Sequence, residues 1–141
     1  IEDSSMTLLR GHFAWTLVVV LDAQFAAVDS TLDGLRQDDL KIAVVELPEE
    51  VPPVHPPTHW LSVHGSDRPG IVSAVTREVA LVGGNITDLT TRLAGNLYVV
   101  LADVFLPEGS DVEGLQSRLA AVAADLGVDV RLREADEDDV L

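Results

Sequence analysis

The chain has 141 residues, of which 47% are hydrophobic. It has no cysteine, which excludes disulfides, thiolate metal sites and cysteine nucleophiles and suits a reducing cytoplasm. Nine basic and 24 acidic residues give a formal net charge of −15, and so negative a surface disfavours direct binding to DNA or RNA. The longest apolar run, residues 15–21, is much shorter than the ~18 residues that signal a membrane-spanning helix, so we expect a folded cytoplasmic protein without membrane contacts.

Two strands, a helix and a third strand are predicted in the first part of the chain. Residues 1–10 alternate between polar and apolar side chains, and residues 13–21 are rich in Val, so they predict antiparallel strands joined by a turn at Gly11. Apolar side chains at three- and four-residue steps predict a helix over 25–37. Another apolar strand is expected over 41–47.

A proline-rich stretch separates this part from the rest. Five of the seven prolines lie between residues 48 and 57, which predicts a stiff, extended linker over 48–58. The linker divides the chain into a first module at 1–47 and a second at 59–134. Residues 135–141 are predicted to be an acidic, solvated tail, with docking to a basic partner as the alternative.

The second part predicts the element order βαββαβ, the split ferredoxin-like arrangement. The expected elements are a strand at 59–65, a helix at 70–82, strands at 85–94 and 97–106, a helix at 112–126 and a strand at 128–133. Asp67 is the predicted N-cap of the first helix, with Pro69 in its first turn and Gly70 removing a side chain at its start. Such a helix N-terminus carries partial positive charge and suits a carboxylate.

An internal repeat relates the two parts. Ile1-Glu2-Asp3 matches Ile86-Thr87-Asp88, Gly11 matches Gly95, and Asp33-Gly34-Leu35 matches Glu113-Gly114-Leu115. The first copy has no counterpart of residues 59–85, so the chain, which starts at Ile1 without a Met, is expected to be a fragment. The first copy also has a shorter helix, which is explained either by residues missing near Gln37-Asp38 or by a stunted helix.

Two motifs of the second part resemble those of the ACT domain, a small ligand-binding module. They are Gly65-Ser66-Asp67-Arg68-Pro69-Gly70-Ile71-Val72 and Gly83-Gly84-Asn85-Ile86-Thr87-Asp88-Leu89. Two such modules with nothing else attached are similar to the glycine cleavage system transcriptional repressor family. The resemblance implies an α+β fold of two ferredoxin-like modules, each an antiparallel sheet with helices on one face, the first lacking its first strand and helix. It also implies pairing of modules, and hence a homo-oligomer.

The resemblance further implies a small amino acid bound at module interfaces. The matching ligand-binding residues are Asp67, Arg68, Pro69, Gly70, Ile71, Asn85 and Ile86. The backbone N–H groups of Gly70 and Ile71 would hold a carboxylate, and Asp67 or Asn85 would accept from the ammonium group. A purely structural role stays open for residues 67–70, and turn formation is the favoured role of Asn85.

Catalytic and metal-binding patterns are weak. His55 and His59 are four residues apart, a spacing that brings two metal ligands together only on a helix. Pro56-Pro57 forbids a helix there, so no metal site is expected. His64 lies three residues before Asp67 and suggests an acid–base pair, but no nucleophile accompanies them in a recognised motif. We therefore expect neither an enzyme nor a cofactor.

These observations predict a non-enzymatic regulatory protein that binds a small amino acid, glycine among the candidates. The net charge of −15 indicates that any role in transcription is exerted through a DNA-binding protein partner and not on DNA itself. Two alternatives stay open. One is the sensory portion of a larger enzyme, because ACT modules occur in uridylyltransferases and formyltetrahydrofolate deformylases. The other is a dimerisation module without a ligand.

Overall fold

The computed structural model of the chain describes residues 1–136, which fold as two compact units. Unit 1 is Ile1–Val51, and unit 2 begins at Pro52. Most of the tail predicted over 135–141 lies outside the described residues. No helix in the described part of the chain is both long and apolar enough to span a bilayer.

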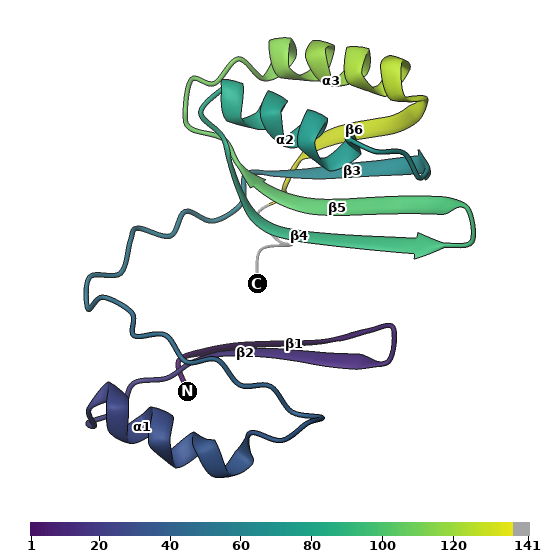
Figure 1. Ribbon diagram of the computed structural model, residues 1–141. Helices are drawn as coiled ribbons and strands as arrows, with labels where there is room; N and C mark the ends of the chain where they lie inside the picture. The colour runs from purple at the N-terminus through teal and green to yellow at the C-terminus, as the bar shows by residue number, and fades with distance from the viewer. Residues whose placement is uncertain (137–141) are drawn as a thin grey trace. The chain divides into compact units, whose positions relative to one another are not determined.

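Unit 2 is a four-stranded antiparallel sheet whose two helices cover one face (Figure 1). The strand order is β4-β5-β3-β6, so β3 is paired on both sides. The elements are β3 (His59–Ser66), α2 (Ile71–Leu81), β4 (Asn85–Ala94), β5 (Leu97–Phe105), α3 (Val112–Leu126) and β6 (Val128–Glu134). The α+β fold, the βαββαβ order and the antiparallel sheet predicted from the sequence are confirmed.

Local chemistry explains where the elements of unit 2 begin and end. The Asp111 side chain accepts a hydrogen bond from the Gly114 N–H at 2.9 Å and so caps α3, which ends at Gly127 in the left-handed conformation (φ 64°). After α2, a Cβ on Gly84 would lie only 2.7 Å from Leu106 Cδ2, so glycine permits the close approach that starts β4.

Alternate residues of the central strands meet the helices in one apolar core. The buried side chains include Leu61 and Val63 of β3, Val75 and Val79 of α2, Val100 and Val104 of β5, and Leu115 and Leu119 of α3. Truncating one of the leucines to alanine typically costs about 2–5 kcal/mol in such a site. The core thus holds both helices against the sheet.

Unit 1 contains the predicted hairpin and a helix. Its elements are β1 (Asp3–Leu9), β2 (His12–Val18), α1 (Phe25–Leu32) and a 3-10 turn, η1 (Asp33–Leu35). The two strands pair antiparallel through a turn in which Arg10 and Gly11 both have positive φ, as a two-residue hairpin requires. The helix predicted over 25–37 ends earlier, because Asp33-Gly34 is a weak helix former and the chain tightens there into η1.

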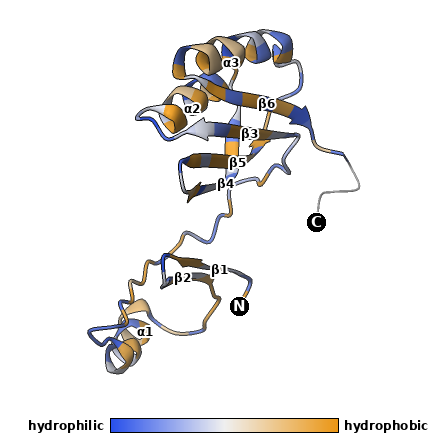
Figure 2. Cartoon of the chain, turned by 90° about the vertical axis from the view of Figure 1, so that its right-hand side faces the viewer, coloured by the Kyte–Doolittle hydropathy of each residue, from blue (hydrophilic) through white to orange (hydrophobic). Residues whose placement is uncertain are grey.

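The prediction of a strand over 41–47 is wrong. These residues pair with no strand in the described chain, although Ile42 and Val44 are half-buried in alternation with exposed neighbours. No residue of unit 1 is buried, and β2 is largely hydrophobic, whereas β1 begins with polar residues (Figure 2). The internal repeat explains why residues 41–47 form no strand. Their counterpart in unit 2 is β6, which pairs only with β3, and unit 1 has no counterpart of β3 among the described residues.

Among residues 1–136, His59 is the one polar residue that is buried. It is 8% exposed, its Nδ1 lies 2.8 Å from Thr58 Oγ1, and its Nε2 has no hydrogen-bond partner among the described residues. Burial lowers the pKa of His59, and the nearby Glu134 carboxylate opposes that shift in part. The imidazole is therefore neutral in the folded protein at neutral pH.

Acidification should weaken unit 2 through His59. Above pH 6.5 the imidazole is neutral in both states, but below it the unfolded chain binds a proton that the folded protein resists, so the free energy of unfolding falls. Urea unfolding at about pH 7.5 and about pH 5.5, followed by Trp60 fluorescence in a Trp15→Phe background, measures this loss. The variant His59→Leu should lose less free energy of unfolding between the two pH values than the parent protein does. An equal loss in both proteins would contradict a buried, neutral His59.

Candidate functional site

The first turn of α2 and the loop before it form the candidate site. The helix begins at Ile71, and its N-cap is Gly70 with φ 90°, a conformation that other residues rarely adopt. The predictions that Asp67 caps the helix and that Pro69 lies in its first turn are wrong. No side chain caps α2, because the left-handed turn at Gly70 separates the helix from the acidic residue three positions earlier.

The N-terminus of α2 is bare. The first hydrogen bond of the helix runs from the Ala74 N–H to the Gly70 carbonyl at 2.9 Å, and no acidic side chain lies in the first turn. The Ser73 hydroxyl donates to the same carbonyl at 3.1 Å and does not cap the amides. The N–H groups of the first turn therefore carry the uncompensated positive end of the helix dipole, which favours an anion.

The Arg68 side chain reaches the end of the other helix, α3. A Cβ built on Gly127 would lie 3.8 Å from Arg68 Nη2, so the guanidinium is close to the C-terminal end of α3. The carbonyls at a helix C-terminus carry partial negative charge, and a cation there is stabilising. The guanidinium is thus placed where it is attracted to the C-terminus of α3, a proximity that sequence reasoning missed because Arg68 and Gly127 are far apart in the chain.

Ile71 and Ile86 are apolar residues of the core. Ile71 is 2% exposed and Ile86 packs against the core, and both line a cavity of about 10 Å³ between α2 and the sheet. That volume is at the lower limit for a single water molecule. An amino acid does not fit in that cavity. Ile71 supports the first turn of α2 by packing into the core, whereas Ile86 belongs to the core and not to the loop.

Asn85 and Ile86 lie at the opposite end of the sheet from the 67–71 loop. Register pairs Asn85 with Phe105 and His59 with Val104, whereas the loop follows Ser66 at the other end of β3. The length of β3 separates the two groups by about 20 Å. Unit 2 therefore does not bring together the two sets of predicted ligand residues. Asn85 is also a strand residue and not part of a turn, since the left-handed position is Gly83 (φ 74°).

The acid–base pair suggested for His64 and Asp67 is wrong. Strand register places His64 opposite Asp129 of β6, and His64 Nε2 lies 3.2 Å from Asp129 Oδ2. The same carboxylate oxygen is 3.0 Å from Arg131 Nη2. All three side chains are about half exposed, and this cross-strand group was not predictable without the register of two strands distant in sequence.

A groove of about 310 Å³ lies between α3 and the edge strand β6. Its lining residues are Gln116, Leu119, Ala120, Val130, Arg131, Leu132 and Arg133. Its volume is at the lower end of the ~300–1,000 Å³ typical of small-molecule sites. None of the seven predicted ligand residues lines it, and sequence patterns alone gave no signal for it.

Family comparison agrees with the geometry of unit 2. A model of the ACT domain family matches residues 60–133, which run from β3 to β6. The chain belongs to the ACT domain family. Within the described residues, no group of three or more His, Asp or Glu side chains is placed to hold a metal ion in this ACT module.

Known relatives extend the comparison. A UPF0237 protein of Methanopyrus kandleri is 32% identical over 77 residues, which are 54% of this chain and 86% of the relative. The crystal structure of an unknown protein from Galdieria sulphuraria is 31% identical with a TM-score of 0.69, covering 96% of this chain and 82% of that one. A candidate glycine cleavage system transcriptional repressor shares the fold, with 22% identity and a TM-score of 0.51 over 60% of this chain and 49% of that one.

Removing the Arg68 cation should weaken unit 2 slightly. Arg68→Ala is expected to lower the free energy of unfolding by about 0.3–1 kcal/mol at low salt, because the C-terminus of α3 loses its cation. The loss should shrink at about 1 M salt, where the Debye length falls to about 3 Å. Arg77→Ala, on the exposed face of α2, is the matched control and should change stability less. Equal losses for both variants would contradict the dipole contact.

Proposed function

We propose that this ACT protein is a non-enzymatic regulatory module that binds a small amino acid, glycine among the candidates, at the N-terminus of α2. The observation that carries the proposal is the bare first turn of α2, which Gly70 begins without a side chain and no acidic residue neutralises. A carboxylate at this position would receive hydrogen bonds from several backbone N–H groups at once.

The ligand site is proposed to form between two ACT modules. The cavity inside unit 2 has only about 10 Å³, and the 67–71 loop and Asn85-Ile86 lie at opposite ends of one sheet. Two copies of the module, paired in a homo-oligomer, would be able to place the loop of one beside the Asn85 end of the other. Asn85 offers an oxygen acceptor for the ligand ammonium group.

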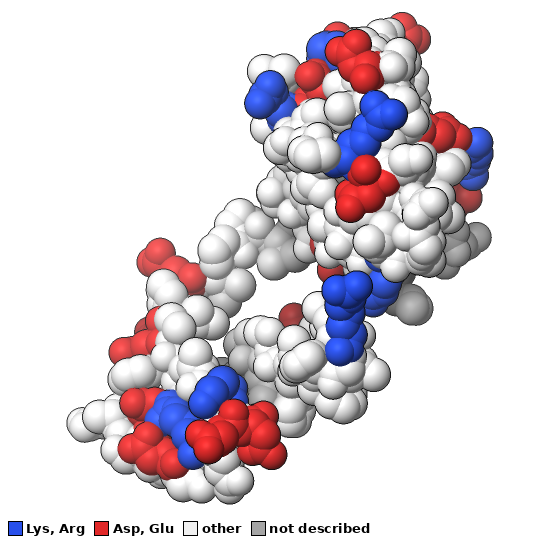
Figure 3. Space-filling model, turned by 45° about the vertical axis from the view of Figure 1, so that its right-hand side comes forward, with Lys and Arg blue, Asp and Glu red and all other residues white. Residues whose placement is uncertain are grey.

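The regulatory output is proposed to pass through a protein partner. The net charge of −15 opposes contact with a nucleic acid backbone, and on the face of unit 2 visible in Figure 3 basic side chains lie next to acidic ones. A role in transcription, as in the glycine cleavage system, would therefore need a DNA-binding partner. The shared fold of the candidate repressor supports the architecture of such a module only.

Two other functions compete with this proposal. In the first, the module senses an amino acid for a larger enzyme, and ligand binding would be the same but the output would be a change in catalytic rate. In the second, the module dimerises without a ligand. Absence of any amino-acid effect on stability or assembly would favour the second.

The substitution Ser73→Asp separates ligand binding from folding. It places a carboxylate in the first turn of α2, where it interacts favourably with the free amides and should raise the free energy of unfolding by about 0.3–1 kcal/mol. The introduced carboxylate would also occupy the free amides of α2 and repel the carboxylate of a ligand. Calorimetry with a panel of amino acids should therefore show binding to the parent protein and at least about tenfold weaker binding to the variant, which corresponds to 1.4 kcal/mol.

Ser73→Ala is the control, since it removes the hydroxyl without adding charge and should retain the ligand. Binding that survives Ser73→Asp unchanged would place the ligand elsewhere on the protein. No heat with any amino acid, and no thermal shift, would overturn the ligand-binding function itself.

A further inference from the structure

The groove between α3 and β6 follows the edge of a strand. Four consecutive residues of β6, from Val130 to Arg133, line one side of it, and its volume is about 310 Å³. At ~3.3 Å per residue these four residues span about 13 Å. The other side is the face of α3 formed by Gln116, Leu119 and Ala120, which are three and four residues apart. The groove is therefore long enough to hold a short extended segment alongside β6.

The outer edge of β6 is continuous and unpaired. Among the described residues β6 pairs only with β3, so its outward backbone N–H and C=O groups have no strand partner there. The pairing runs from Val128 to Glu134 without a register shift, and the strand contains no proline. The opposite edge strand, β4, has a register shift between Ile86 and Asp88, and such irregularities discourage pairing along an edge. Of the two edges of this sheet, β6 is thus the better template for an added strand.

The side chains of β6 divide between the two faces of the sheet. Leu132 is buried in the core and Val130 packs against it, whereas Arg131 and Arg133 are exposed on the face that the helices leave uncovered. A strand added beside β6 would place alternate side chains over the apolar floor of the groove, near Leu119 and Leu132, and the others opposite the two arginines. The sequence that suits this arrangement alternates acidic residues with apolar ones.

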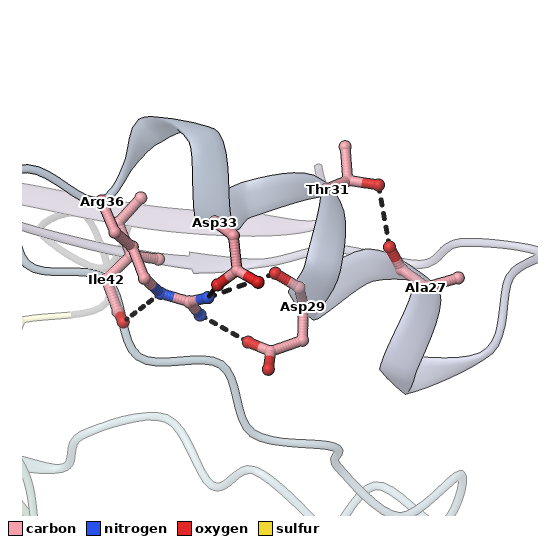
Figure 4. A network of polar contacts seen from close by, with 6 residues as sticks. All are labelled: Ala27, Asp29, Thr31, Asp33, Arg36 and Ile42. Carbon is pink, nitrogen blue, oxygen red and sulfur yellow. Dashed lines mark hydrogen bonds and ion pairs between the residues drawn. The ribbon is translucent and has the colours of Figure 1, made fainter.

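The acidic chain neutralises some of its own arginines. In unit 1, Arg36 donates through Nε to the Ile42 carbonyl at 3.2 Å and forms ion pairs with the Asp29 and Asp33 carboxylates (Figure 4). Because two carboxylates surround one guanidinium, this arginine has no excess charge to offer a partner.

The arginines of the groove are less engaged. Arg133 forms no ion pair with any of residues 1–136, and Arg131 Nη2 lies 3.0 Å from a single carboxylate, that of Asp129. The same carboxylate is shared with His64 Nε2 at 3.2 Å. In a chain of net charge −15, the charged residues that line this groove in the described part of the structure are both arginines. An acidic segment is complementary to them.

We propose that the edge of β6 and the groove beside α3 form a docking site for a partner protein, which binds through an extended segment of alternating acidic and apolar residues added to the sheet. The acidic residues of this segment lie opposite Arg131 and Arg133, and its apolar residues fill the groove over Leu119 and Leu132. The site uses neither the N-terminus of α2 nor Asn85, so it does not depend on the proposed amino-acid site.

Charge disfavours a second copy of the chain in this place. Antiparallel pairing of two β6 strands about residue 131 sets the two Arg131 side chains opposite each other, and pairing about residue 132 sets Arg131 opposite Arg133. Like charges directly opposite each other are destabilising. A partner segment with carboxylates at these positions replaces that repulsion with attraction.

A labelled peptide tests the site directly. The probe is fluorescein-labelled Val-Glu-Val-Glu-Val-Glu-Val, titrated with the full 141-residue chain and followed by fluorescence anisotropy. It should bind at least about tenfold more tightly than Glu-Val-Val-Glu-Glu-Val-Val, which has the same composition without the alternation. Binding should also slow amide hydrogen exchange in β6, whereas exchange in β4 is the internal reference and should not change.

Charge reversal tests the role of the arginines. The double variant Arg131→Glu, Arg133→Glu should bind the alternating peptide at least about tenfold more weakly, and it should prefer the same peptide with Lys in place of Glu. Arg92→Glu makes the same change on the edge strand β4, outside the groove, and should weaken binding by less than about twofold. Arg133→Gln leaves the pair of Arg131 with Asp129 in place, so it tests the site even where the double variant fails to fold, and should weaken binding by about threefold.

Three results would overturn the inference: equal affinity for the two peptides of the same composition, equal losses in the groove variants and Arg92→Glu, or slowed exchange in β4 in place of β6. Protection of β6 that rises with protein concentration in the absence of peptide would overturn it as well, by identifying a second copy as the occupant. Ser73→Asp should bind the peptide as the parent protein does, so failure of amino-acid binding and failure of this docking site are separate results.

Discussion

The pairing of β3 on both of its edges is the interaction on which the rest of unit 2 depends. This strand joins β5 to β6, and its buried residues Leu61 and Val63 meet both helices. Where it ends decides where α2 begins, so the position of the bare helix N-terminus follows from the register of β3. The opposite end of the same strand buries His59, which couples the strand's pairing to a neutral imidazole.

The same constraint explains which elements were predictable. The six elements of unit 2 follow from side-chain periodicity and turn residues, and the observed boundaries differ from the predicted ones by one residue at most. Residues 41–47 have an equally strong apolar pattern, yet they form no strand. Propensity describes a preference of the residue, whereas a strand also needs a neighbour, and the neighbour of this segment would be a counterpart of β3.

The site was predictable only in part, for reasons of the same kind. A loop followed by a helix N-terminus could be inferred from local sequence, and it is present. The predicted N-cap was wrong because sequence preference for a cap favours Asp67, whereas the left-handed turn at Gly70 sets the first residue of α2. The pairing of His64 with Asp129 and the approach of Arg68 to α3 depend on register and helix packing, which no local pattern contains. Topology alone, however, separates Asn85 from the loop, since a strand that follows a returning helix starts at the far end of the sheet.

Electrostatics narrows the class of ligand that suits the α2 terminus. The free amides attract an anion within the first turn, but the chain as a whole carries −15 and repels ligands of net negative charge at longer range. A phosphate or a dicarboxylate would meet this repulsion, and the Arg68 guanidinium lies near the end of α3. A zwitterion has no net charge to be repelled, its carboxylate fits the amides, and its ammonium group is favoured by acidic surroundings. The short-range dipole and the long-range negative field together therefore support the proposed amino-acid ligand over a phosphate or a dicarboxylate.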